Sequence, residues 1–448
     1  MVDPNHYPKL IFGDKVKTTL GDLRSLTDQS VDLITSAKPL IKVLPQVLGE
    51  PDEKKYLVIF QNDKELRPTG GFMTAYSIFR LDSGIVHADR SSDIYDLDAT
   101  VPNKPKAPRP LLQYLPKVPQ LNLRDTNLSP DFKQSMEDFS DMYKKAGRYV
   151  EVDGIVALDT HALVSILEVL GEVTAGGITF TTKNDPRCNC PQVVYELEVF
   201  ADQPTNTIRE DRKSIIGDLM YALMNKAFSS SPKQYWGPLF QTLLTEMSEK
   251  HVLFTMYDKD AQAGFEGLNA AGRILDFEGD YFHLNEANFG GAKSNMFVTQ
   301  NVTQDYAVQG DGSIVKTVTV DYKNPQPPSD CNLERGNLCL NAVLRNWVRV
   351  YVPKGSELVL SQGSEVKMIT YEELGKTVFE GFLTVRPQGV AKLKISYKLP
   401  FKLGQNTLPV LIQKQPGTDG DEYTLTASGK TLEKFELVTD KTLNLKLR

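Results

Sequence analysis

Three short segments of the sequence place arginines and acidic residues where predicted elements begin or end. The segment 62–72, with Glu65 and Arg67, directly follows an apolar run that predicts a strand buried on both faces. Because ligands bind at the carboxyl ends of the strands in an open α/β sheet, we expect both side chains at the mouth of a crevice. Gly70 and Gly71 come next and would let the backbone approach a ligand closely.

The other two segments carry further arginines. Arg124 and Asp125 follow a proline-rich stretch and precede a predicted helix, and Arg209 and Arg212 lie near the start of another helix. Two residues three positions apart share one face of a helix. Since an arginine fork can bind a phosphate through two hydrogen bonds, these residue types favour the binding of a phosphate or another anion.

Each segment also has an ordinary structural interpretation. The two glycines could form a tight turn with Arg67 in an ion pair, the second segment could be a helix entry, and the third a solvated helix face. The motifs G-x-S-x-G, G-x-x-x-x-G-K, G-x-G-x-x-G and H-E-x-x-H do not occur. Spacing alone therefore does not establish an enzyme.

The composition is that of a folded globular chain and argues against a nucleic-acid binder. Of the 448 residues, 40% are hydrophobic and 24% are charged, and the net charge is -6. Nucleic-acid binding needs a concentrated basic surface, and no run rich in Lys and Arg is present, so we exclude that class. No window is apolar enough for a membrane helix, and the first residues lack the charged and apolar parts of a signal peptide.

The four cysteines form two close pairs in loop-like sequence. We favour a disulfide between Cys331 and Cys339 and consider another between Cys188 and Cys190, where strain leaves free thiols or cross-pairing as alternatives. A zinc site is the rival interpretation, but no histidine lies near the second pair and the five histidines show no ligand spacing. Disulfides predict an oxidising, non-cytosolic compartment.

Hydrophobic periodicity divides the chain into three parts. Residues 1–50 are predicted as a helical lead-in, because apolar residues recur there at helical spacing. Strands and helices alternate over residues 51–295, which predicts an α/β domain with a mostly parallel sheet flanked by helices. Over residues 296–448 short strands follow one another without a long helix, which predicts a C-terminal all-β sandwich.

Several segments resemble one bacterial family, the domain of unknown function 4012. They span residues 56 to about 300 and read YLVIFQNDKELRPTGGF, LRDTNLSPDF, VDGIVALDTHALVSILEVLGEV, IREDRKSIIGDLMYALMNK and NFGGAKSNMF. The C-terminal β region is also similar to what usually follows in that family. Because members typically carry an upstream membrane anchor, the resemblance implies an extracytoplasmic envelope protein at the outer face of the cytoplasmic membrane, with an anchor absent from this chain.

That family in turn distantly resembles the LytR-CpsA-Psr phosphotransferases, which move glycopolymers from a polyprenyl-pyrophosphate carrier onto the cell wall. The resemblance is one of motif order: an arginine after the first strand, an Arg-Asp-Thr triplet, a V-D-G strand before a helix, and an arginine-rich helix start. It implies that Arg67, Arg124, Arg209 and Arg212 bind the pyrophosphate, with Asp125 as a further catalytic candidate.

The resemblance also implies Mg²⁺ as the cofactor, although the sequence departs from the pattern at this point. The phosphotransferases have Arg-Ser-Asp after the first strand, whereas this chain has Arg67-Pro68-Thr69. Glu65 could replace that carboxylate, with Asp125 as a second ligand, or the metal is absent. Lys293 could add to the anion site, although the glycines before it could instead form a hinge into the β domain.

Two functions from different classes follow. The first is the binding, and potentially the transfer, of a polyprenyl-pyrophosphate-linked glycan, with arginines and a divalent cation positioning the phosphoryl group. The second is a non-catalytic surface or adhesion protein that keeps a degenerate phosphotransferase-like scaffold. Convergence of the four arginines on one pocket would favour the first function.

Overall fold

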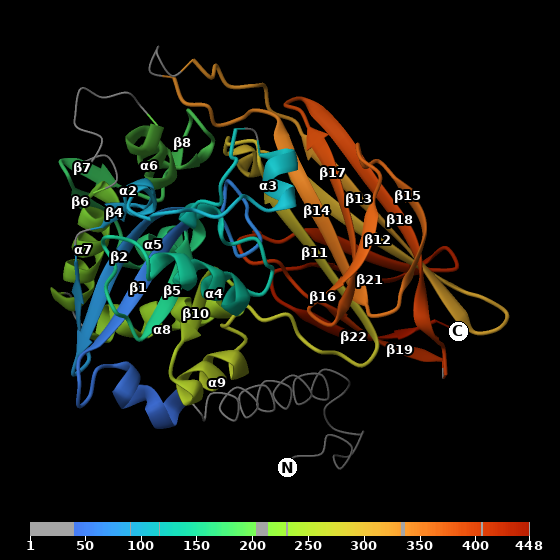
Figure 1. Ribbon diagram of the computed structural model, residues 1–448, viewed down its shortest axis with the longest axis horizontal. Helices are drawn as coiled ribbons and strands as arrows, with labels where there is room; N and C mark the ends of the chain where they lie inside the picture. Colours follow the sequence, from blue (N-terminus) through green and yellow to red (C-terminus); the bar gives the residue numbers. More distant parts are fainter. Residues whose placement is uncertain are drawn as a thin grey trace, which may run out of the picture.

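The computed structural model describes residues 40–89, 91–115, 117–202, 214–229, 232–332, 337–404 and 406–447. An α/β region comes first and two large β-sheets follow it (Figure 1). The expected fold class, an α/β domain followed by a β-sandwich, is therefore confirmed. Of the expected lead-in, residues 40–47 are helical, and residues 1–39 lie outside the described part. No described helix is both long and apolar enough to cross a membrane.

The first sheet has the strand order β10-β5-β1-β2-β3, with β4 paired to β2. The bounds are β1 Lys54–Asn62, β2 Phe72–Asp82, β3 Ile85–Ala88, β4 Ser92–Asp93, β5 Gly154–Asp159 and β10 Val252–Met256. Only the β1–β5 pair is parallel, and the other pairs are antiparallel. The sheet is thus mixed and not mostly parallel, because β1 returns directly into β2 as a hairpin and needs no crossover helix.

Helices cover both faces of this sheet (Figure 1). Alternate residues of β1 point to opposite faces: Leu57 and Ile59 pack in the cluster that contains α4, and Val58 and Phe60 pack in the cluster that contains α5, α6 and α7. The helices are α2 Ile94–Ala99, α3 Arg109–Tyr114, α4 Phe132–Tyr143, α5 Thr160–Leu170, α6 Gln192–Asp202, α7 Ser214–Ser229, α8 Pro232–Ser248 and α9 Lys259–Gly267, with 3-10 turns η2 Leu123–Asp125 and η4 Ser294–Met296.

Two small hairpins lie between α5 and α6. They are formed by β6 Val173–Ala175 with β7 Ile178–Phe180, and by β8 Asn184–Asp185 with β9 Cys190–Pro191. Both expected disulfides are present in the structure. Cys188 bonds to Cys190 at the second hairpin, and Cys331 bonds to Cys339 in the connection between two strands of the sandwich. The described part of the chain contains no free thiol.

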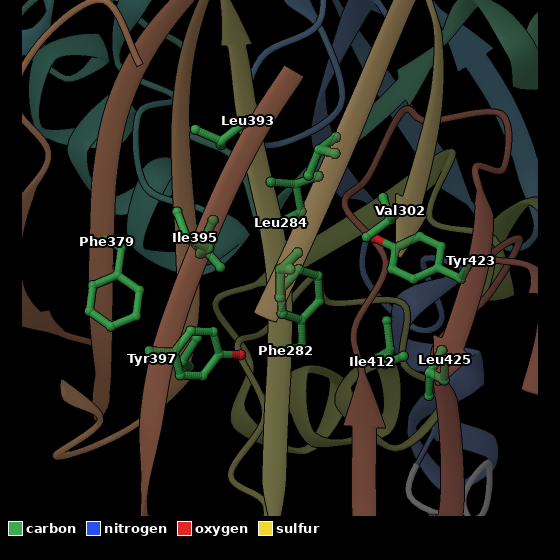
Figure 2. Packing of buried hydrophobic residues seen from close by; sticks show 14 of the residues in the cluster. Phe282, Leu284, Val302, Phe379, Leu393, Ile395, Tyr397, Ile412, Tyr423 and Leu425 are labelled. Atoms are coloured by element: carbon green, nitrogen blue, oxygen red, sulfur yellow. The ribbon is translucent and has the colours of Figure 1, made fainter. Parts of the chain in front are cut away.

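The second region consists of two six-stranded sheets packed face to face, with the orders β16-β17-β14-β11-β19-β22 and β15-β18-β13-β12-β20-β21. The strands are β11 Asp280–Asn288, β12 Thr299–Val308, β13 Ser313–Asn324, β14 Leu344–Pro353, β15 Glu357–Gln362, β16 Ile369–Glu373, β17 Lys376–Val385, β18 Gly389–Lys402, β19 Thr407–Ile412, β20 Glu422–Ala427, β21 Lys430–Glu436 and β22 Lys441–Lys446. Figure 2 shows side chains of both sheets meeting in the core, among them Phe282 of β11 and Tyr397 of β18.

The sandwich begins at β11, which starts at Asp280. The change in periodicity had predicted its start at residue 296. Strand β11 reads DYFHLNEAN, and all nine of its residues are buried. Because several of its buried residues are polar, apolar periodicity did not predict this strand.

The buried charges of β11 are paired or hydrogen-bonded. Asp280 forms a 2.6 Å ion pair with Lys316, and burial lowers the pKa of that lysine. Glu286 accepts hydrogen bonds of 2.7 Å from Tyr322 and 2.6 Å from Gln300. Burial nevertheless raises the pKa of Glu286 to about 7, because hydrogen bonds only partly replace the water that a carboxylate loses.

Candidate functional site

The loop 63–71, which joins β1 to β2, folds tightly back onto the end of β1. The backbone N–H of Gly70 donates to the carbonyl oxygen of Arg67 at 3.0 Å, and Gly70 has a φ of +126°, a conformation that favours glycine. A Cβ atom on Gly71 would lie only 2.3 Å from the carbonyl carbon of Asn62. Neither glycine lines the cavity described below. They shape the loop, which differs from the ligand contact expected from the sequence.

The β-sandwich holds the same loop from the other side. The backbone N–H of Asn288 donates to the carbonyl oxygen of Leu66 at 2.9 Å, and the side-chain amide of Gln415 donates to the carbonyl oxygen of Arg67 at 3.1 Å. Lys64 forms a 2.9 Å ion pair with Asp419. The position of the loop therefore depends on both regions of the chain.

A cavity of about 470 Å³ opens beside this loop and extends between the first sheet and its helices. Its polar part includes Glu65 and Arg67 of the loop, Arg124 and Asp125 of η2, and Lys293. The remainder is largely apolar and comes from β1, β5, α5, α6 and α7, whose contributions are Phe60, Leu158, Leu163, Val194, Leu197, Ile215, Ile216 and Met220.

Glu65 lies between two cations in the polar part. One carboxylate oxygen is 3.1 Å from Nη2 of Arg67, and the other is 2.9 Å from Nζ of Lys293. Arg67 is only 3% exposed, and its guanidinium lies near the rings of Phe72 and Phe289, at 5.3 and 4.8 Å from their centroids. Within the described residues, Nε and Nη1 of Arg67 have no hydrogen-bond partner. Unsatisfied donors on a buried cation are costly, so an anionic ligand would stabilise this arrangement.

Arg124 is also held in place by a carboxylate. It bonds to the buried Asp98, and its guanidinium lies 4.2 Å from the centroid of the Tyr95 ring. The adjacent Asp125 accepts a hydrogen bond of 3.1 Å from the side chain of Asn122. Burial raises the pKa of the Asp125 carboxyl above its usual value, although the positive charges of the nearby arginines oppose the shift.

The cavity brings together five of the residues predicted from the sequence: Glu65, Arg67, Arg124, Asp125 and Lys293. Arg209 and Arg212 lie outside the described residues, so their convergence on the site stays a prediction. The helices on either side of residues 203–213 both line the cavity, α6 with Leu197 and α7 with Ile215.

Sequence reasoning missed three acidic residues of the cavity lining, which are Asp93, Asp159 and Glu198. Asp159 ends β5, which runs parallel to β1, so the rule that selects the carboxyl ends of strands could have found it. Asp93 precedes α2, and Glu198 lies in α6. The sequence of α6, QVVYELEVF, alternates as a strand would, so periodicity did not predict a helix there.

Glu65, the first of the expected magnesium ligands, does not fit the metal well. Both oxygens of Glu65 face a cation, Arg67 on one side and Lys293 on the other, and a third positive charge there would be repelled. The geometry therefore makes Glu65 a partner that positions two cations.

A comparison with protein families matches residues 52–186 to the family described as protein of unknown function (DUF4012). The resemblance to that family is thus confirmed over this segment. No curated protein matches the chain.

Solved structures that match part of the chain include protein gbs0355 from Streptococcus agalactiae, with 11% identity, a TM-score of 0.30, and coverage of 50% of this chain and 77% of that one. TagV from B. subtilis has 12% identity, a TM-score of 0.24, and coverage of 49% and 81%. A putative nutrient binding protein from Legionella pneumophila has 8% identity, a TM-score of 0.23, and coverage of 38% and 68%. At these scores the function has to be argued from the cavity itself.

Proposed function

We propose that the cavity binds the pyrophosphate end of a lipid-linked glycan in the bacterial cell envelope. The observation that carries the proposal is the division of one cavity into two parts. Arg67, Arg124 and Lys293 lie beside acidic residues in the polar part, and the other part is lined largely by apolar side chains. A polyprenyl pyrophosphate has the same two halves, an anionic group that arginines can bind and a hydrocarbon chain that gains by leaving water.

The two halves would contribute comparable free energies. A hydrogen bond to a charged group is worth about 1.5 to 3 kcal/mol, and each buried methylene about 0.8 kcal/mol. A ten-carbon prenyl chain therefore adds several kcal/mol only if the apolar part of the cavity receives it. A ligand with both halves should bind much more tightly than either half alone.

The charges of the site favour binding over transfer. Arg67 and Lys293 already share Glu65, and Arg124 is compensated by Asp98. Such ion pairs fix the cations in place, so they can orient a diphosphate without large rearrangement. They also reduce the positive charge available to a phosphoryl group in a transition state, and Glu65, which already faces two cations, is poorly placed to hold a magnesium ion. We therefore propose a binding role and assign no chemical step.

The proposed location is the outer face of the cytoplasmic membrane. The two disulfides support an oxidising compartment, since disulfides seldom persist in the cytosol. A lipid-linked ligand would be within reach of the cavity there. The upstream anchor implied by the family resemblance belongs to this proposal as well.

Isothermal titration with geranyl pyrophosphate, inorganic pyrophosphate and geraniol tests the proposal. We expect geranyl pyrophosphate to bind more tightly than either of the other two, and Arg124→Ala to weaken its binding by about 10- to 100-fold. Arg80→Ala is the matched control, because Arg80 is a half-exposed arginine of β2 that does not line the cavity. Equal binding of pyrophosphate and geranyl pyrophosphate would contradict a role for the apolar part, and equal loss in both variants would contradict the assignment of Arg124.

A further inference from the structure

A second group of ligand-type side chains lies behind the cavity wall, around Asp159. It consists of His161 in the first turn of α5, Glu246 near the end of α8, and His251 just before β10. One potential ligand atom from each residue lies within 4.8 Å of the others. Sequence spacing does not predict this group, because chain folding brings together residues from two helices and a strand entry.

Two of the potential ligand atoms are already spaced almost as they would be around a metal ion. Nδ1 of His161 is 3.0 Å from a carboxylate oxygen of Glu246. Two ligand atoms that each lie 2.0 to 2.1 Å from a tetrahedral zinc ion are separated by about 3.3 Å, so this pair needs little movement. The imidazoles of His161 and His251 are stacked, with centroids 4.0 Å apart. One ring must tilt for both lone pairs to converge, and His161, whose side chain is 34% exposed, has room to do so.

A buried carboxylate orients the second histidine from behind. Nδ1 of His251 is 2.6 Å from Asp159, and the two side chains are 1% and 2% exposed. When Nδ1–H donates to this carboxylate, Nε2 is left as the acceptor. A histidine that binds a metal through one nitrogen usually donates the other N–H to a carboxylate in this way. Asp159 is itself fixed, because it also accepts from the backbone N–H of Ala162 at the start of α5.

The local charge favours a cation. Glu246 and Asp159 are both buried, and Asp419 lies close enough to act electrostatically on both imidazoles. The hydrogen bond to Glu246 raises the pKa of His161 to about 9, so a metal ion has to displace a proton from this imidazole. The three nearby carboxylates would then stabilise the positive charge of the ion. The exposed edge of His161 provides access from solvent and leaves a coordination position for water.

We propose that His161, Glu246 and His251 bind a divalent transition-metal ion of the zinc class. Two imidazoles and one carboxylate are a ligand set of three-residue zinc sites, whereas Mg²⁺ and Ca²⁺ prefer shells of oxygen atoms. None of the three ligands lines the anion-binding cavity, although Asp159, which orients His251, does. The bound metal would link α5, α8 and the start of β10.

Titration of the metal-free, full-length chain with ZnCl₂ tests this site. We expect one equivalent of Zn²⁺ to bind and to raise the midpoint of thermal unfolding, because the ligand set exists only in the folded state. His161→Ala and Glu246→Gln should each weaken Zn²⁺ binding by at least about 100-fold. MgCl₂ at the same concentrations should not raise the midpoint.

The matched control is His87→Ala, because His87 is an exposed histidine of β3 away from the group. Its affinity for Zn²⁺ should equal that of the original chain. His161→Ala replaces a partly exposed residue, and its unfolding midpoint without metal establishes that it folds. Stoichiometric Zn²⁺ binding that persists in folded His161→Ala, or no binding by the original chain, would overturn the proposal. Neither result bears on the binding of geranyl pyrophosphate, so the two proposals can fail separately.

Discussion

Replacing Arg67 with alanine should lower both the folding stability of the chain and its affinity for a pyrophosphate. The side chain is buried, is paired with Glu65 and packs near two aromatic rings. Removing one member of a buried ion pair costs about 3 to 5 kcal/mol, because the other charge stays buried. Here Glu65 keeps its 2.9 Å contact with Lys293, so we expect the lower end, about 3 kcal/mol.

The affinity loss has a separate origin. A hydrogen bond between charged groups is worth about 1.5 to 3 kcal/mol, which corresponds to roughly 10- to 100-fold in the dissociation constant. Arg67→Lys should recover only part of either loss, since an ammonium group cannot reproduce the two-pronged hydrogen bonding of a guanidinium.

A double-mutant cycle with Glu65→Gln separates the ion pair from simple loss of packing. Stability is measured by urea unfolding followed by circular dichroism, and affinity by titration with geranyl pyrophosphate. If the pair is real, Arg67→Ala combined with Glu65→Gln should be less destabilised than the sum of the single variants, by about 1 kcal/mol or more. Additive losses of stability would refute the ion-pair argument, and an unchanged affinity in folded Arg67→Ala would refute the role of Arg67 in ligand binding.

Three further predictions concern single residues. Glu286 has a folded-state pKa of about 7, raised above 4.5, so the protonated group favours folding below pH 4.5 and this contribution is lost as the pH rises through 7. Between pH 5 and pH 8 this group should remove roughly 2 to 3 kcal/mol of unfolding free energy from the original chain. Urea unfolding of Glu286→Gln should lack that loss, and an equal loss in both chains would contradict the assignment. Lys316→Met should cost about 3 to 5 kcal/mol of unfolding free energy by leaving Asp280 buried and unpaired, and adding Asp280→Asn should restore much of it; no restoration would contradict the pairing. Gly71→Ala should cost about 1 to 3 kcal/mol and weaken geranyl pyrophosphate binding, because its Cβ would displace the backbone of Asn62, and an unchanged thermal midpoint would contradict this reasoning.

The sequence predicted helices and strands well where the apolar periodicity agrees with the glycines, prolines and capping residues that end an element. The helix Thr160–Leu170 and the strand Val252–Met256 have the bounds that their apolar patterns indicate. The direction of neighbouring strands was less accessible. Whether β1 is followed by a crossover or by a hairpin depends on the loop 63–71, whose path is set by contacts with residues far along the chain.

The candidate site could be predicted in part for the same reason. Arg67 follows a predicted strand and Arg124 follows a proline-rich stretch, and the structure places both in one cavity. Their ion pairs were harder to predict, because Arg124 pairs with Asp98, 26 residues earlier in the chain. Glu65, the partner of Arg67, is also held by Lys293 from far along the chain. The His161, Glu246 and His251 group was inaccessible for a stronger reason, because no local pattern links its members.

The contacts between the loop 63–71 and the sandwich also bear on how the protein would respond to force. Gly417 packs so closely on Gly70 that a Cβ atom there would lie 1.9 Å from the carbonyl oxygen of Gly70, and Lys250 forms a 2.6 Å ion pair with Asp440 across the same boundary. A pull that separated the two regions would have to break these contacts and would release the cavity loop at once.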